Sequence, residues 1–317
     1  MKPPTSDGKL ELAGLDGSNP LAFLAAVGTL RVLTLGMPDS DVRLGWRKSN
    51  GAWRPAISAA EGLAPDFVID RLFNQLSTMR DHPALSRWDN LAVRADDFRA
   101  YAVQAVAAAT SEDRIWADYA AAFACETTIT ADRKAPVVQD TAFRTMGGAG
   151  HQDFLGFMRN IIQITEREHL STALFDEWRY DDPSVNSTLR WDPADDVRHA
   201  LRWRNPSGDP ARNAGGTMLG ANRLAIEALP LFPVAPIRTR LETTGFSGSG
   251  KGGTFWSWPI WSPAIGLDVC RSLLALEELQ RDTPDRTLHA LGIVAAFRSQ
   301  RITEGKYRNF TPARALC

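Results

Sequence analysis

The longest apolar stretch of the chain begins at Pro20 and has no charged residue before Arg31. Ser18 or Asn19 can cap a helix there, because a short polar side chain accepts a hydrogen bond from a first-turn amide, and Pro20 suits the first helical position. The stretch contains large residues and also small ones such as Gly28, so one side can fill a core while the other lets a neighbouring backbone approach. The pattern predicts an N-terminal helix buried in the protein core.

This apolar stretch does not have the features of a membrane anchor or a secretory signal. Arg31 and Thr34 interrupt it before it reaches the ~20 residues that span a bilayer. The preceding segment contains Asp7, Glu11 and Asp16, where a secretory signal has positive charge. We therefore expect no contact with membranes.

The three cysteines indicate a reducing environment. Cys125, Cys270 and Cys317 are odd in number and far apart, which fits neither a disulfide framework nor zinc-ligand spacing. The sequence therefore predicts a cytoplasmic protein.

The hydrophobic pattern changes its period along the chain. Residues 41–57 alternate apolar and polar positions around Ser49-Asn50-Gly51, which predicts a β-hairpin. Helical spacing then dominates residues 66–79, 95–123 and 151–178. The N-terminal part of the chain is therefore expected to be rich in helices.

After residues 181–187 the chain changes to short strands, turns and prolines. Residues 200–204 and 292–302 alternate like strands, and residues 266–279 are amphipathic like a helix. The sequence predicts an α+β fold with two parts, a helix-rich region 1–185 with an N-terminal helix and hairpin, and a mixed α+β region 186–317 with short antiparallel strands.

A glycine-rich segment resembles a nucleotide-binding loop only in part. Gly245, Gly250 and Lys251 have the spacing of a phosphate-binding P-loop, but Gly252 stands where Ser or Thr must bind magnesium. The following residues 254–258 alternate like a strand, where a P-loop requires a helix. We expect a hairpin loop in which Lys251 can contact a nucleic-acid backbone.

The sequence shows no complete catalytic or metal-binding signature. The five histidines form no HExxH motif, and the cluster Glu166–His169 is typical of a solvated helix face. Acidic doublets suit helix caps better than a two-metal site; they are Asp96-Asp97, Asp181-Asp182 and Asp195-Asp196. We expect a protein that is not an enzyme and that has no cofactor or metal, with a metal-dependent phosphodiesterase or nuclease as the alternative.

Positive charge is concentrated late in a chain whose formal net charge is -1. Residues 198–251 contain eight Lys or Arg and three Asp or Glu, and residues 297–317 contain five and one. Most of the ten tryptophans are expected in the core. In a strand that buries Trp203, the neighbouring Arg202 and Arg204 point outward. The pattern favours an anionic partner for the C-terminal region.

The sequence thus predicts a nucleic-acid-binding surface built from cations. Its candidate residues are Arg202, Arg204, Arg238, Arg240, Lys251, Arg298, Arg301, Lys306 and Arg308. The competing interpretation is that several of these arginines form internal salt bridges with carboxylates of the same region; the candidates are Asp192, Asp195, Asp196 and Glu304.

Four blocks resemble proteins encoded at type I CRISPR loci of the I-U or I-G kind. The blocks are residues 19–33, 190–209, 220–234 and 297–314, and the first is similar to the start of large-subunit-like proteins of these loci. The resemblance implies a structural, non-catalytic subunit of an RNA-guided surveillance complex. Its implied partners are CRISPR RNA, target DNA and other effector subunits, while a separate helicase-nuclease cuts. The remaining alternative is a protein-interaction scaffold that contacts no nucleic acid.

Overall fold

The computed structural model describes residues 5–6, 8–110, 113–130, 136–148, 152–183, 185–195, 216–248, 253–281, 287–304 and 307–316. The helices are α1 (Pro20–Gly36), α2 (Pro65–Ser77), α3 (Pro83–Ser86), α4 (Ala95–Ala108), α5 (Ile115–Phe123), α6 (Phe154–Ile164), α7 (Arg167–Phe175), α10 (Leu219–Ile226), α11 (Leu267–Leu274) and α12 (Thr287–Ala290), with 3-10 turns η1 (Pro193–Asp195), η2 (Leu229–Leu231) and η4 (Glu277–Gln280). The strands are β1 (Thr5–Ser6), β2 (Lys9–Glu11), β3 (Arg43–Ser49), β4 (Ala52–Ser58), β5 (Ala124–Ile129), β6 (Val138–Asp140), β7 (Val234–Ile237), β8 (Arg240–Thr243), β9 (Phe246–Ser247), β10 (Thr254–Trp261), β11 (Ile293–Glu304), β12 (Tyr307–Phe310) and β13 (Arg314–Ala315).

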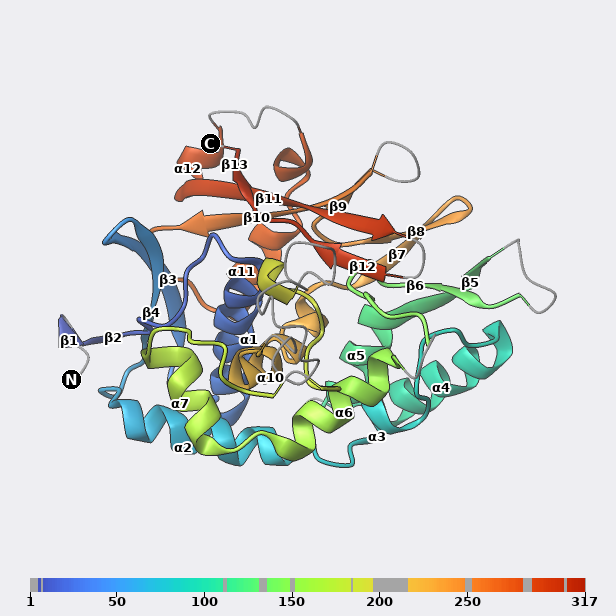
Figure 1. Ribbon diagram of the computed structural model, residues 1–317, viewed down its shortest axis with the longest axis horizontal. Coiled ribbons are helices and arrows are strands. Elements are labelled where there is room, and N and C mark those ends of the chain that lie inside the picture. Colours follow the sequence, from blue (N-terminus) through green and yellow to red (C-terminus); the bar gives the residue numbers. More distant parts are fainter. Residues whose placement is uncertain are drawn as a thin grey trace, which may run out of the picture.

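The predicted α+β class is confirmed. One antiparallel sheet has the strand order β12-β11-β10-β9, with β13 also paired to β11, and a second has the order β1-β2-β4-β3. The hairpins β5–β6 and β7–β8 form two further small sheets. In Figure 1 the β9–β12 sheet lies on one side of the molecule, helices α2, α3, α6 and α7 lie on the opposite side, and α1 and α10 lie between them.

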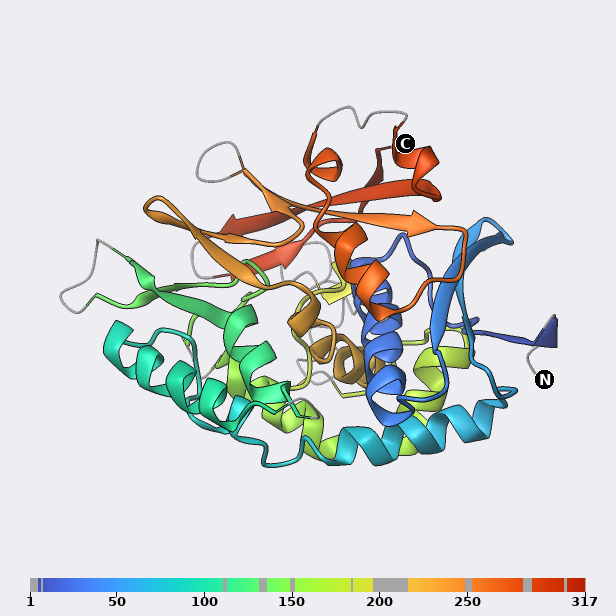
Figure 2. The same ribbon diagram turned by 180° about the vertical axis from the view of Figure 1, so that it is seen from behind.

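Helix α1 is the buried N-terminal helix that its sequence predicts. The Asn19 side chain caps it by accepting hydrogen bonds from the backbone N–H groups of Leu21 and Ala22. Every residue from Pro20 to Leu33 is buried. At Gly28 the helix meets α10 so closely that an added Cβ would lie 1.9 Å from the carbonyl oxygen of Leu224. The small residue is therefore required by a backbone contact between α1 and α10, which Figures 1 and 2 show beside each other.

The predicted hairpin at residues 41–57 is also confirmed. Strands β3 and β4 pair antiparallel, and the turn residues Asn50 and Gly51 both have positive φ angles of 51° and 80°. Two consecutive positive φ angles are typical of a type I′ turn, for which Asn-Gly is the preferred pair. The local sequence therefore specifies this turn and its register.

The core is built around aromatic rings from distant parts of the chain. Phe23 of α1 lies 5.7 Å from the ring of Trp46, 5.7 Å from Trp258 and 6.3 Å from Trp261. The β10–β11 register shifts between Ile260 and Trp261, which reorients Trp261 relative to strict alternation. The fully buried Trp258 and Trp261 confirm the core role expected for these tryptophans.

Buried residues from both sides of residue 186 belong to one hydrophobic cluster. The α1–α10 contact and the Phe23–Trp258 contact both join region 1–185 to region 186–317. The division of the chain at residues 185 and 186 stays a prediction. Within the described ranges, no helix is long and apolar enough to cross a lipid bilayer.

Candidate functional site

The nine cations predicted to bind nucleic acid have different outcomes in the structure. Arg202, Arg204, Lys251 and Lys306 lie outside the described residues. Arg238 and Arg240 are exposed, at the turn of the β7–β8 hairpin and at the start of β8. Arg301 and Arg308 line a cleft, whereas Arg298 is buried.

The prediction that Arg298 is exposed is wrong. Its side chain is 3% exposed, and its Nε donates a hydrogen bond to Ser257 Oγ at 2.8 Å. Its Nη2 donates to the backbone carbonyl oxygens of Leu279 at 2.9 Å and Arg281 at 2.8 Å. Alternation along β11 placed Arg298 on the face away from Phe297, but the chain around η4 covers that face. The guanidinium therefore connects β11 to the η4 segment.

The cleft that contains Arg301 and Arg308 has a volume of about 640 Å³. It lies where the end of the β9–β12 sheet meets the hairpins β5–β6 and β7–β8, with η4 on its rim. In both ribbon views the two hairpins lie together at one end of this sheet (Figures 1 and 2). The cleft therefore joins strands that are far apart in the sequence.

Arg301 is half-buried in the wall of the cleft. Its Nη1 donates a hydrogen bond to the carbonyl oxygen of Ala142 at 2.7 Å, while its buried Nε has no acceptor among the described residues. Burial, and then the positive charges of Arg308 and Arg144, lower the pKa of Arg301 to about 10, although Asp140 acts in the opposite direction. The guanidinium remains protonated at neutral pH in a position that disfavours its charge.

Arg308 lies next to Arg301 because of the sheet register. Arg301 of β11 pairs with Phe310 of β12, so Arg308, two residues before Phe310, projects from the same face as a diagonal neighbour. Arg308 Nη1 donates to the carbonyl oxygen of Arg144 at 3.2 Å. Both guanidiniums are therefore tied to the backbone of the short segment that follows β6.

Arg144 is a third cation of the cleft, which the sequence did not indicate. It is 6% exposed, and its Nη1 lies 2.9 Å from Asp140 Oδ2. No periodic pattern marks Arg144, because it lies outside regular secondary structure and reaches the cleft only through tertiary packing. The local signal was a pair of opposite charges four residues apart, with Asp140 at the end of β6 and Arg144 beyond it.

The cleft is also lined by carboxylates, and they differ from its arginines in solvent exposure. Glu242 of β8 and Glu277 of η4 line it and are exposed, whereas Asp140 is largely buried beside Arg144. Among the described residues, no carboxylate forms an ion pair with Arg301 or Arg308. The site therefore combines two guanidiniums that form no ion pair with a described carboxylate, a buried Arg144–Asp140 pair, and exposed carboxylates at its edge.

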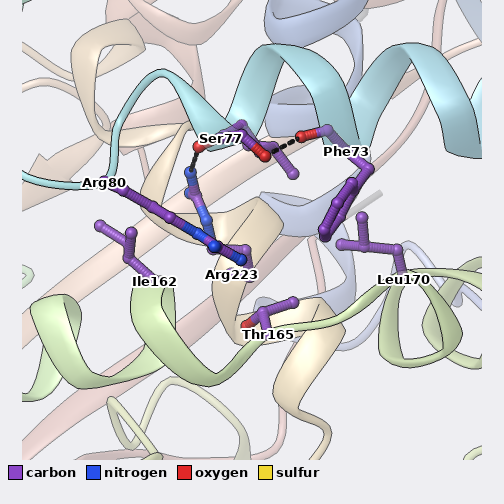
Figure 3. Close-up of a pocket in the computed structure, with 8 residues that line it drawn as sticks. Phe73, Ser77, Arg80, Ile162, Thr165, Leu170 and Arg223 are labelled. Atoms are coloured by element: carbon purple, nitrogen blue, oxygen red, sulfur yellow. Dashed lines mark hydrogen bonds between the residues drawn. The ribbon is translucent and has the colours of Figure 1, made fainter.

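A second pocket is smaller and contains a neutralised cation. Figure 3 shows it between α2, which carries Phe73 and Ser77, and the α6–α7 segment, which carries Thr165. Its volume of about 10 Å³ is that of a single water molecule. Arg223 in its wall is bound by Glu227 Oε1 at 2.8 Å and by the Leu76 carbonyl oxygen at 3.1 Å. This pocket belongs to the packing of the core.

The other groups considered for chemistry have structural roles. Glu166 and Glu168 are exposed, as expected for a solvated helix face, and Glu166 and His169 also form the capping box of α7. Asp96 and Asp97 lie in the first turn of α4 as expected, and Asp182 Oδ2 accepts a hydrogen bond from the backbone N–H of Leu219, the first residue of α10. Within the part of the chain that the structure describes, no three His, Cys, Asp or Glu side chains gather closely enough to hold a metal ion.

The glycine-rich segment leads into a strand, as its pattern predicted. Gly248 and Gly253 both have positive φ angles, and β10 begins directly afterwards at Thr254. A P-loop requires a helix at this position. The strand found there instead supports the interpretation of the glycine-rich segment as a hairpin loop. Ser247 and Gly248 at the start of this loop line the cleft, while Lys251 lies outside the described residues.

No protein-family model matches the sequence of this chain, and no curated protein sequence is similar to it.

Proposed function

We propose that this protein is a non-catalytic, cytoplasmic subunit of a type I CRISPR RNA-guided surveillance complex, in which the Arg301–Arg308 cleft contacts the guide RNA or the target DNA. The resemblance of four sequence blocks to proteins of I-U or I-G loci gives the biological context. The observation that carries the proposal is the pair of guanidiniums on adjacent strands with no carboxylate partner among the described residues. The other subunits of the complex are the remaining partners.

The electrostatics of the cleft favour a phosphate ligand. Burial and neighbouring positive charges destabilise the protonated form of Arg301. A bound phosphate supplies the missing negative charge together with oxygen acceptors, and guanidinium groups bind phosphate through charge-assisted hydrogen bonds. Binding of phosphate would therefore offset the unfavourable burial of Arg301 and its repulsion by the neighbouring arginines.

The exposed cations of the β7–β8 hairpin extend the same surface. Strand β8 continues from Arg240 into Leu241 and Glu242, which line the cleft. The Gln139 side chain fixes this hairpin, donating to the Thr239 carbonyl oxygen at 3.0 Å and accepting from the Leu241 N–H at 2.8 Å. A single strand of RNA or DNA that enters the cleft can therefore also contact Arg238 and Arg240.

The alternatives have less support. A metal-dependent phosphodiesterase needs clustered carboxylates or histidines, and the described part of the chain offers no such group. A scaffold that contacts only proteins would have no use for two unneutralised arginines in a cleft, but it explains the apolar exposure of Val103 and Val106, which are 62% and 67% exposed.

The salt dependence of binding tests the proposal. We would measure the affinity of the purified protein for single-stranded RNA and DNA across a range of salt concentrations, for the unchanged chain and for Arg308→Ala. Affinity falls as salt rises, and loss of one phosphate contact should make the plot of log affinity against log salt less steep by about 0.7. The sequence preference should stay unchanged. Arg314→Ala, which removes an exposed arginine of the same sheet outside the cleft, is the matched control. An unchanged slope in a folded Arg308→Ala protein would reject the phosphate role of the cleft.

A further inference from the structure

We infer that the cleft is selective for RNA, holding one or two ribonucleotides with phosphate on Arg301 and Arg308 and a 2′-hydroxyl donated to Glu242 or Glu277. This inference rests on the proposed function and narrows its ligand from nucleic acid in general to single-stranded RNA. Three properties of the cleft support it: its size, the separation of its charges, and two buried polar atoms that lack partners.

The size of the cleft limits the length of chain that it can hold. A volume of about 640 Å³ lies within the ~300–1,000 Å³ range of sites for small molecules and cofactors. Such a site accommodates one or two nucleotide units of a flexible single strand, whereas a duplex would contact only its rim. The affinity should therefore depend on the first few nucleotides and little on further length.

The separation of charges argues against a ligand that presents only phosphates. Glu242 and Glu277 are exposed on β8 and η4, while Arg301 and Arg308 lie deeper on β11 and β12. An ionised carboxylate accepts hydrogen bonds and donates none, so it repels phosphate but attracts a hydroxyl group. A ribonucleotide presents both groups within one unit, whereas the 2′-hydroxyl is absent from DNA.

Two buried polar atoms of the cleft lack a hydrogen-bond partner in the described part of the chain, and one needs an acceptor while the other needs a donor. Arg301 Nε is a buried donor and Gln280 Oε1 is a buried acceptor, and neither has a hydrogen-bond partner among the described residues. Native proteins pair nearly all such groups, and these two atoms belong to residues that line the cleft, where a ligand can supply the partner. A nucleotide supplies phosphate oxygens as acceptors and hydroxyl or amino groups as donors.

The test compares two ligands that differ only at the 2′ position. We would measure binding of oligouridylate and oligodeoxyuridylate, each two and eight residues long, by fluorescence anisotropy at constant salt. The eight-residue RNA should bind about tenfold more tightly than its DNA counterpart, because a hydrogen bond to a charged group contributes on that order. The two-residue RNA should retain most of the RNA preference.

Variants assign that preference to particular side chains. Glu242→Ala with Glu277→Ala should bring the RNA-to-DNA affinity ratio close to one, because the proposed acceptors of the 2′-hydroxyl are lost. Both residues are exposed, so the variant should stay folded. Arg308→Ala should weaken both ligands and keep the ratio. Thermal denaturation of each variant checks that it is folded, and Arg314→Ala is again the control outside the cleft.

The outcomes separate this inference from the proposed function. Equal affinities for the two eight-residue ligands would overturn RNA selectivity but leave nucleic-acid binding in place. An RNA preference that survives the double glutamate variant would overturn the role of the rim carboxylates. Failure of the unchanged protein to bind either ligand would overturn the proposed function itself.

Discussion

Two regions of the molecule hold pairs of buried or partly buried arginines, and they differ in what neutralises them. At the α1–α10 contact, Arg31 and Arg223 both lie 2.8 Å from the carboxylate of Glu227. In the cleft, the side chains of Arg301 and Arg308 donate only to backbone carbonyl oxygens among the described residues. A buried charge costs several kcal/mol unless it is paired. The arginines at the α1–α10 contact are neutralised within the protein, whereas an anionic ligand would stabilise the arginines of the cleft.

The pKa of the acidic partner reflects this difference. Burial alone raises the pKa of Glu227, but the nearby Arg223 and Arg31 outweigh it and hold the pKa below its usual value. The carboxylate therefore stays ionised in the core. The Arg301 guanidinium, by contrast, has its pKa lowered, because burial and like charges dominate there. The same residue type is structural in one region and a candidate ligand contact in the other.

The largest effect is expected from removing the shared carboxylate. Glu227→Gln leaves the buried Arg223 without an ion-pair partner among the described residues and leaves Arg31 with only Asp118, whose Oδ2 lies 4.0 Å from Arg31 Nη2. This should lower the free energy of unfolding by about 3–5 kcal/mol. Urea denaturation would measure this loss. Glu277→Gln is the control, because Glu277 is exposed and should change the stability by less than about 0.5 kcal/mol. A Glu227→Gln protein as stable as the unchanged chain would show that the α1–α10 arginines need no neutralisation.

A backbone clash at the same contact should also be severe without any change of charge. Gly28→Leu places a branched side chain where even a Cβ would lie 1.9 Å from the Leu224 carbonyl oxygen. Overpacking of this kind costs about 1–3 kcal/mol or more, so we expect a lower melting temperature and lower soluble yield. Gly62→Leu is the control, because an added Cβ there has no neighbour within 4 Å. An unchanged melting temperature for Gly28→Leu would contradict the close packing of α1 on α10.

Acid should weaken the α1–α10 contact through Glu227. Its pKa is lower in the folded protein than in the unfolded chain, so its contribution to stability is fully present above the unfolded value of about 4.5 and is lost as pH falls toward the folded value. Denaturation at pH 7 and at pH 3.5 should show a larger loss in the unchanged protein than in Glu227→Gln. Identical losses would exclude Glu227 as a source of acid sensitivity.

Removing a cleft arginine should have the smallest effect on folding. Arg308→Ala relieves the repulsion of Arg301 while removing one hydrogen bond, so the free energy of unfolding should change by less than about 1 kcal/mol in either direction. Thermal denaturation beside Glu227→Gln measures the contrast directly. A loss as large as that of Glu227→Gln would show that the cleft arginines, like Arg31 and Arg223, serve the fold.

The sequence predicted local structure well wherever short-range rules apply. Asn19 and Pro20 marked the start of α1, and Asn50-Gly51 marked the β3–β4 turn, because caps and turns depend on a few adjacent residues. It failed at Arg298, where alternation correctly gave two faces of a strand but did not reveal that the η4 segment covers the second face.

The cleft likewise shows which features of this protein can be predicted from its sequence and which cannot. The amino-acid pattern alone was enough to predict an α+β chain, a buried α1, and a strand that carries Arg301. Tertiary packing places Arg308 and Arg144 in one cleft with Arg301, buries Arg298 against the η4 segment, and gives Arg31 and Arg223 one shared carboxylate. Periodicity and propensity act over a few residues, whereas the neutralisation of a charge depends on which distant segments pack against it.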